Sequence, residues 1–378
     1  MTGSSSASRG SFLTRPGDLF APAPYRVETA TFDGFVLDSS YGQLNALLAQ
    51  QLGSVTGGEC RVVALVPCVI LTYISIARSF SLTQDKSQAG YYLENDLMCW
   101  VVVAQFRRGA VLPERVGLYA PFVWVDEPAA LIEGREGFGY PKGFGAISIP
   151  VAGEATEFSC DAYTFPGDPS GQLEIRTVNR VAPADRVQPA ADERIDTERP
   201  GSPQADDDLV ERWTTADQAR DAILARLVDN PSTHHFAPDL PPADLARAFA
   251  SSPWLTFLMR QFRSAASPAD AVCQELVAAP FAGVTFHGGG LRHGEWTADF
   301  PVLPALDLAA LLGVQRSNRV RLAYRVTLDT TLAPGSIIWS SSSARERGLC
   351  LQASVLAHSG WSWLECKLRQ LRERRRQG

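Results

Sequence analysis

Paired cysteines, long apolar runs and an excess of basic residues are all missing from this sequence, and each absence excludes a class of protein. Seven cysteines are spread along 378 residues without a Cys-x-x-Cys pair. An odd number of dispersed cysteines is typical of free, buried thiols in a reducing compartment and not of a disulfide framework. No apolar run is long enough to cross a bilayer, and the Ser- and Gly-rich stretch 1–15 has no apolar core of the signal-peptide kind. We therefore expect a cytoplasmic protein without membrane contact.

Positive charge and several ligand-binding signatures are also scarce. The chain has 35 Lys and Arg against 41 Asp and Glu, a net charge of −6, which argues against nucleic acid as a partner. There is no Gly-x-x-x-x-Gly-Lys-Ser/Thr phosphate loop and no Gly-x-Ser-x-Gly nucleophile elbow. His287 and His293 flank a run of glycines without a Cys or carboxylate cluster, and this favours a hairpin loop over a metal site. We expect no metal and no cofactor, and a small molecule as the partner.

What the sequence does contain is a series of apolar, β-branched runs. They predict many strands and few helices, in an α+β, mainly β fold of curved antiparallel sheets that form a barrel. The absence of alternating βαβ units excludes a doubly wound nucleotide fold. The predicted strands are 25–36, 61–77, 97–106, 117–125, 146–151, 172–178, 252–263, 284–287 and 320–328, and the predicted helices are 41–52, 126–134, 209–228 and 270–278.

Composition divides the chain into one domain with polar additions. Residues 1–20 indicate a disordered leader, and 21–340 a single domain. The segment 182–208 is rich in Pro, Asp, Glu and Arg and nearly free of large apolar residues, which predicts a mobile insertion. The segment 341–378 is a C-terminal tail with a basic end, and no role can be assigned to it.

The run Gly134–Gly143 holds the most reactive arrangement in the sequence. Its glycines permit sharp turns, and Pro141 stiffens the backbone before Lys142. Aromatic residues flank the lysine, namely Phe138, Tyr140 and Phe144. Desolvation by such neighbours lowers the pKa of a lysine, and the neutral amine is the form that attacks a ketone. The alternative is an ordinary surface lysine in a glycine-rich turn, since most lysines are exposed.

The same run resembles a known active-site signature. Gly134-Arg135-Glu136, followed after three residues by Tyr140-Pro141-Lys142, is similar to the signature of the acetoacetate decarboxylase family, whose lysine forms a Schiff base with the substrate. Weaker similarity extends over most of residues 20–180 and 250–340. The resemblance implies a cone- or barrel-like fold, usually assembled as a homo-oligomer. That family is an established example of a lysine activated by desolvation or by a neighbouring cation.

The resemblance also implies roles for further residues. Glu94 corresponds to an active-site glutamate that faces the amine, and Tyr73 falls near a second one. Phe138 and Tyr140 would line the substrate site. Arg135 either holds the substrate carboxylate by a forked contact or forms a structural pair with Glu136.

The expected function is that of a cofactor-independent carbon–carbon lyase, a carboxy-lyase that uses Lys142 to decarboxylate a keto acid. Two alternatives stay open: a Schiff-base aldolase-dehydratase acting on pyruvate-like substrates, and a non-catalytic ligand-binding member of the family. Two departures motivate them, because the family's second lysine is Gly143 here and a family arginine falls near Ala30. Without a cation at position 143, we expect a lowered pKa for Lys142, though lowered less than in a two-lysine site. A closed aromatic cavity around Lys142 would favour catalysis over mere binding.

Overall fold

The computed structural model describes residues 19–83, 90–150, 157–167, 170–184, 209–228, 255–264, 266–267 and 269–341. Most of the predicted leader (1–20), insertion (182–208) and tail (341–378) lies outside the described residues and remains a prediction. The start of the insertion is wrong, because Ala182 and Pro183 end a paired strand. The single-domain boundary likewise remains a prediction.

Strands dominate the described chain. They are β1 (Tyr25–Asp38), β2 (Cys60–Ser81), β3 (Tyr92–Arg107), β4 (Arg115–Val125), β5 (Lys142–Ser148), β6 (Phe158–Thr164), β7 (Glu174–Pro183), β8 (Leu209–Trp213), β9 (Leu255–Arg263), β10 (Ala271–Arg292), β11 (Trp296–Asp299), β12 (Ser317–Arg319), β13 (Leu322–Leu332) and β14 (Ser336–Ser340). The helices are α1 (Tyr41–Leu48), α2 (Pro128–Glu133), α3 (Ala216–Val228), α5 (Leu308–Leu312) and the π-helical turns η1 (Ala49–Gly53) and η2 (Gly134–Phe138).

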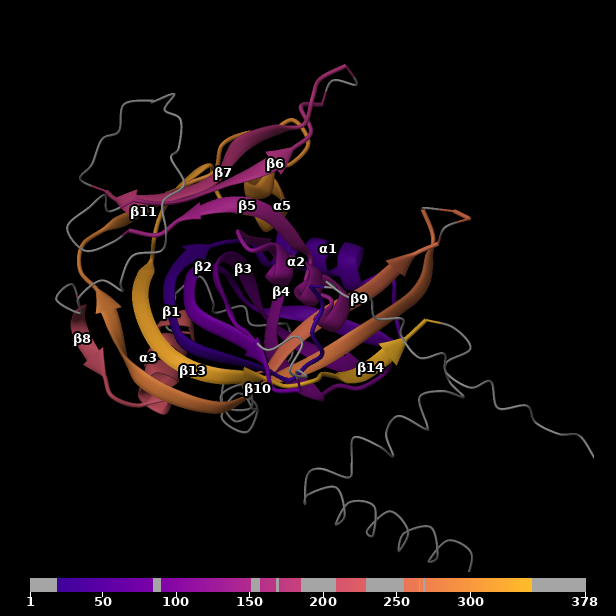
Figure 1. Ribbon diagram of the computed structural model, residues 1–378, viewed down its shortest axis with the longest axis horizontal. Coiled ribbons are helices and arrows are strands. Elements are labelled where there is room, and N and C mark those ends of the chain that lie inside the picture. Colours follow the sequence, from indigo (N-terminus) through magenta and orange to yellow (C-terminus); the bar gives the residue numbers. More distant parts are fainter. Residues whose placement is uncertain are drawn as a thin grey trace, which may run out of the picture.

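The strands form a ring, as Figure 1 shows. Consecutive neighbours run β4–β3–β2–β1–β13–β10, β9 pairs with β10, and the ring closes where β9 pairs with β4. These pairings are antiparallel except for β4 with β9. The predicted mainly β fold with a curved, barrel-like sheet is therefore confirmed.

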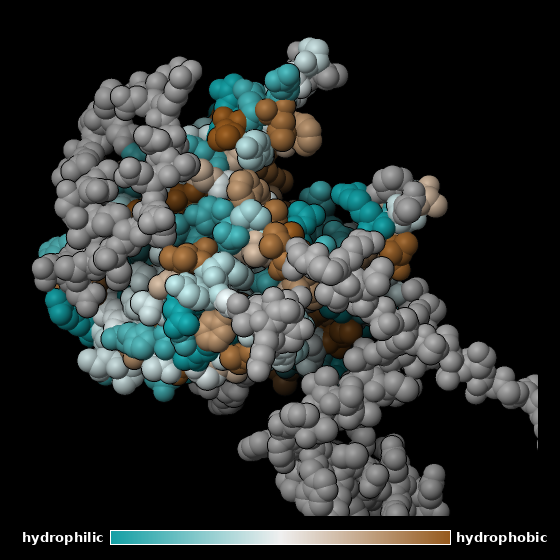
Figure 2. Space-filling view, in the orientation of Figure 1, coloured by the Kyte–Doolittle hydropathy of each residue, from teal (hydrophilic) through white to brown (hydrophobic). Residues whose placement is uncertain are grey.

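A smaller wing of strands leaves the ring at β4. There β5 pairs in parallel with β4, and Lys142 lies opposite Val123. The sheet continues through β6, β7, β11 and β12, and β6 and β7 lie along the upper side of Figure 1. In the space-filling view, apolar residues are exposed at that upper edge (Figure 2). Lys142 thus begins the strand that links ring and wing.

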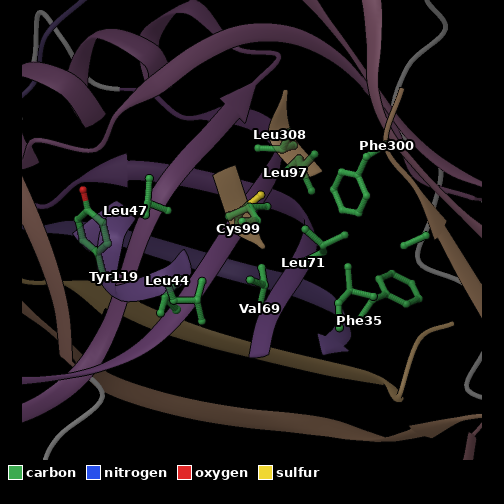
Figure 3. Packing of buried hydrophobic residues seen from close by; sticks show 14 of the residues in the cluster. Phe35, Leu44, Leu47, Val69, Leu71, Leu97, Cys99, Tyr119, Phe300 and Leu308 are labelled. Carbon is green, nitrogen blue, oxygen red and sulfur yellow. The ribbon is translucent and has the colours of Figure 1, made fainter. Parts of the chain in front are cut away.

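Both faces of β2 and β3 are buried, because a separate apolar cluster packs on each. Side chains of a strand point to alternate faces. On β3, and on β2 from Val66 onwards, even-numbered residues such as Ile74 and Met98 join the cluster that also contains Phe138 and Tyr140, which we name the site-side core. Odd-numbered residues, such as Leu71 and Cys99, join the other cluster (Figure 3). This alternation decides which side chains can reach Lys142.

Three local predictions are wrong. Residues 270–278, predicted as a helix, and the glycine run near His287, predicted as a hairpin loop, belong to the single long strand β10. Gly290 fits there because the carbonyl of Glu211 on β8 comes within 1.9 Å of the position that a Cβ would take. The first residues of 209–228 form β8, and only α3 is helical. Pairing with distant strands overrides local periodicity in each case. No helix in the described ranges combines the length and apolar character needed to cross a bilayer.

Candidate active site

Lys142 is placed by a short helical segment that runs into β5. Pro128 occupies the first turn of α2, and the Glu127 carboxylate accepts a hydrogen bond from the N–H of Ala129 at 3.2 Å. This is a favourable helix start. The helix widens into η2, which ends at Gly139 in the left-handed region at φ 93°. Glycine adopts this conformation without strain. Gly134–Phe138, whose glycines permit sharp turns, thus forms a helical turn.

The backbone around Lys142 is held by its own segment. The guanidinium of Arg135 donates to the carbonyl oxygen of Lys142 at 3.0 Å. Arg135 and Glu136 are both exposed, so a buried pair between them is wrong, and the substrate-binding role of Arg135 remains a prediction. A Cβ on Gly134 would come within 2.5 Å of Lys142 Cδ. The lysine chain therefore runs directly over the helix end, where only glycine leaves room.

The amine of Lys142 lies inside the protein beside two carboxyls. Lys142 is 6% exposed, Glu94 7% and Asp96 2%. Lys142 Nζ lies 3.4 Å from Glu94 Oε2 and 3.9 Å from Asp96 Oδ1. The first distance permits a weak charged hydrogen bond, and the second does not. The predicted neighbourhood of Lys142 and Glu94 is present in the structure.

Both carboxyls come from β3, two residues apart, and so they point to the same face. The residue between them anchors the strand. The N–H of Asn95 donates to Asp126 Oδ1 at 2.7 Å, and its side-chain amide donates to Oδ2 at 2.8 Å. Asp126 directly precedes the α2 segment, and this contact fixes the carboxyl-bearing strand relative to the segment that carries Lys142.

The two carboxyls reverse the expected shift in the pKa of Lys142. Burial lowers the pKa of Lys142, but Asp96 and Glu94 raise it by more, and the net pKa lies above its ordinary value. Our prediction of a lowered pKa is therefore wrong, because it considered the aromatic neighbours without these charges. Burial also raises the pKa of Glu94 and raises that of Asp96 well above its ordinary value. The three groups titrate together, and Glu94 is the carboxylate that pairs with the ammonium.

Two small cavities share Lys142, Glu94 and Tyr140 as lining residues. The first, about 30 Å³, has several polar side chains in its wall and is lined by Tyr25, Ser79, Tyr92, Glu94, Ala130, Glu133, Gly134, Phe138, Tyr140, Lys142 and Leu332. The second, about 50 Å³, is bordered mainly by apolar side chains of β1, β2, β3, β10 and β13, among them Ile74, Met98, Trp100 and Phe281. Among the described residues that line the two cavities, Lys142 alone carries a positive charge.

The other predicted residues divide between the two faces of the sheet. Phe138 and Tyr140 are buried at the cavity, as expected. Tyr73 is not there: its side chain points to the opposite face, where its hydroxyl donates to Asn179 Oδ1 at 2.8 Å. Its odd position on β2 explains the error. Phe144 is 38% exposed and stacks on Tyr163, so it does not cover the lysine.

The structure shows the surroundings of Gly143 and Ala30, the two positions that depart from the family pattern. A Cβ on Gly143 would face Trp124, at 3.1 Å from its ring, on the side of the sheet away from Lys142. A lysine at this position would therefore not lie beside the amine of Lys142. Ala30 is fully buried in the site-side core and brings no charge to the cavity.

Sequence reasoning missed two carboxyls. Asp96 could have been found, because the pattern Glu94-x-Asp96 places both side chains on one face of a strand. Glu133 gave no signal beyond its place before the signature. The described residues hold no group of three or more His, Cys, Asp or Glu placed to share a metal ion.

Comparison with known proteins agrees with this geometry. The family model described as acetoacetate decarboxylase matches residues 79–166, which include the carboxyls of β3 and Lys142. The resemblance to the acetoacetate decarboxylase family is confirmed. No curated protein matches the chain significantly.

Solved structures share the acetoacetate decarboxylase fold at low identity. One, from structural studies of acetoacetate decarboxylase, has a TM-score of 0.52 at 13% identity and covers 86% of this chain and 93% of its own. The enzyme from Legionella pneumophila subsp. pneumophila str. Philadelphia 1 has a TM-score of 0.52 at 12% identity, with coverages of 90% and 99%. An acetoacetate decarboxylase-like enzyme from Sphingomonas wittichii RW1 has a TM-score of 0.51 at 18% identity, with coverages of 88% and 100%. At identities this low, the structural similarity shows the fold alone, and the chemistry must be argued from the site.

Proposed function

We propose that the protein is a cofactor-independent lyase in which Lys142 forms a Schiff base with a keto acid and decarboxylates it. The observation that carries this proposal is a buried lysine that lines two cavities and whose amine lies next to Glu94 and Asp96. A lysine retained only for binding gains nothing from such costly burial. This placement favours catalysis over the non-catalytic alternative.

The chemistry follows from the amine. After it passes its proton to a neighbouring carboxylate, Lys142 Nζ attacks the ketone. The carboxyl then returns the proton, and loss of water gives a protonated imine. The carbon–carbon bond to the carboxylate then breaks. Its electron pair forms the enamine double bond while the imine electrons move onto nitrogen, and CO₂ leaves. Protonation of the enamine carbon and hydrolysis release the product and free the amine.

The cavity walls favour decarboxylation over aldol chemistry. A substrate carboxylate in the apolar cavity, close to Glu94 and Asp96, is poorly solvated and repelled, and its conversion to neutral CO₂ relieves both effects. An aldolase-dehydratase retains the carboxylate of its pyruvate-like substrate and needs a cation to hold it. Among the described lining residues, the lysine that becomes the imine is the only cation.

Reductive trapping tests the proposal. The chain has three lysines, Lys86, Lys142 and Lys367, which makes assignment simple. Borohydride with acetoacetate or pyruvate should add a stable mass to the peptide that contains Lys142. Lys142→Arg should lose both this mass and CO₂ release, because a guanidinium remains protonated. Lys86→Arg serves as the matched control. Failure of a broad panel of keto acids to label folded protein would refute the proposal, and release of condensation products without CO₂ would indicate the aldolase alternative.

A further inference from the structure

A third buried carboxyl, Glu133, lies at the cavity of Lys142 and has no part in the chemistry above. It is the last residue of α2 and is 4% exposed. Its Oε2 accepts a hydrogen bond from the hydroxyl of Tyr92 at 2.5 Å, and its Oε1 accepts one from the N–H of Ala21 at 3.3 Å. Both donors are neutral. Buried carboxyls that serve structure are usually paired with a cation, and this one is held without an ion pair among the described residues.

The position of Glu133 ties it to the reacting amine. Glu133, Tyr92, Glu94 and Lys142 all line the smaller cavity. The lysine chain crosses the helix at Gly134, the residue that follows Glu133. A cavity of about 30 Å³ is large enough to hold a water molecule. This space therefore suits a water molecule or the small carbon next to an imine on Lys142.

We propose that Glu133 is the proton donor and acceptor at the carbon adjacent to the Lys142 imine, an assignment that rests on the proposed Schiff-base function. After CO₂ has left, the carboxyl of Glu133 gives its proton to the enamine carbon. A C–H bond forms, the nitrogen electrons restore the imine, and Glu133 remains as a carboxylate that regains a proton from water. With a simple ketone bound as the imine, the same group removes a proton from this carbon and returns one.

The electrostatic setting supports this role. Burial raises the pKa of Glu133 to about 7, in spite of the hydrogen bonds from Tyr92 and Ala21 that lower it, and Glu94 raises it further. The titratable groups that face it are Tyr25 of β1, Tyr92 and Glu94 of β3, and Lys142 of β5. A group that is half ionised near neutrality gives and takes protons with equal ease. Glu94 is less suited, because it pairs with the ammonium of Lys142.

Hydrogen exchange of a ketone separates this step from imine formation. In D₂O, the full-length protein should exchange the methyl hydrogens of acetone for deuterium, which NMR can follow. A plot of the exchange rate against pH should have a limb near pH 7. Glu133→Gln should slow exchange by on the order of 10²-fold or more, whereas borohydride trapping of acetone on Lys142 should persist. Glu136→Gln is the matched control, since that carboxylate is exposed one turn along the same segment.

Tyr92→Phe gives a second, independent test of the role of Glu133. Its hydroxyl lowers the pKa of Glu133 through a hydrogen bond, and its loss should move the limb of the exchange profile to higher pH. Wild-type exchange in a Glu133→Gln variant that still traps acetone would overturn the role of Glu133 and leave the Schiff base intact. A limb that stays in place in Tyr92→Phe would also count against it. Absence of trapping in the wild type would refute the proposed function itself.

Discussion

At the scale of single residues, the charge of the Lys142 amine is set by carboxyls that lie beside it. Burial alone would lower the pKa of the amine, and the aromatic neighbours foreseen from the sequence act in that direction. Asp96 and Glu94 oppose burial and raise the pKa of Lys142 above its ordinary value. The resting site therefore holds an ammonium, and a proton must leave before the amine can attack.

Asp96→Asn should make imine formation possible at lower pH. The substitution removes the neighbour that raises the pKa of Lys142 most, while the similar shape of asparagine preserves packing. The pH midpoint of borohydride trapping should move downwards relative to the wild type. Asp161→Asn, a substitution on β6 of the wing, is a suitable control and should leave the midpoint in place. An unchanged midpoint in folded Asp96→Asn would mean that Asp96 is already protonated and adds no charge to the site.

At the scale of secondary structure, the segment from α2 through η2 to β5 positions the side chain of Lys142. The sequence of this segment predicted where the helix starts and which residue is reactive, because both depend on local chemistry. The π-helical turn and the facing of each strand depend on long-range pairing. For this reason Tyr73 and Phe144 were misplaced, and Gly143 was wrongly regarded as a neighbour of the amine.

The close passage of the lysine chain over Gly134 makes a sharp prediction. Gly134→Ala should reduce imine trapping on the order of 10²-fold, because a methyl group would displace Lys142 Cδ, and a shift of about 1 Å can cost that much. The free energy of unfolding should change little, since alanine is favoured over glycine in a helix. Gly137→Ala lies in the same turn and meets only the Phe20 ring at 3.4 Å, an ordinary contact. Equal trapping by the two variants would show that the Lys142 side chain is not closely packed against residue 134.

At the scale of the whole molecule, the ring brings together carboxyls that no local pattern connects. The sequence predicted a curved, mainly β fold, since strand-forming runs are frequent, but not which strands close the ring. The pairing of β4 with β9 joins residues far apart in the chain. Glu133 reaches the cavity because α2 follows β4 within that ring, and this could not be deduced from neighbouring residues alone.

The cost of burying Glu133 should appear in the pH dependence of stability. Its pKa is about 7 in the folded protein against an ordinary value of 4.5. Below pH 4.5 both states are protonated. As the pH rises, the unfolded chain releases its proton first, and stability is lost until the folded state also ionises near pH 7. At 1.36 kcal/mol for each pKa unit, this carboxyl accounts for a loss of up to about 3 kcal/mol.

Glu133→Gln should therefore flatten the stability profile. Urea unfolding at pH 5 and pH 8 should show a wild-type loss of unfolding free energy that is smaller in Glu133→Gln by up to about 3 kcal/mol. Glu136→Gln should follow the wild type, because its carboxylate is exposed in both pH ranges. Parallel profiles for all three proteins would mean that Glu133 is ionised at pH 5, and a carboxyl ionised at that pH could not protonate the enamine carbon efficiently at neutral pH. The same buried carboxyl would thus explain a loss of stability and a gain in proton transfer, and the two measurements must agree.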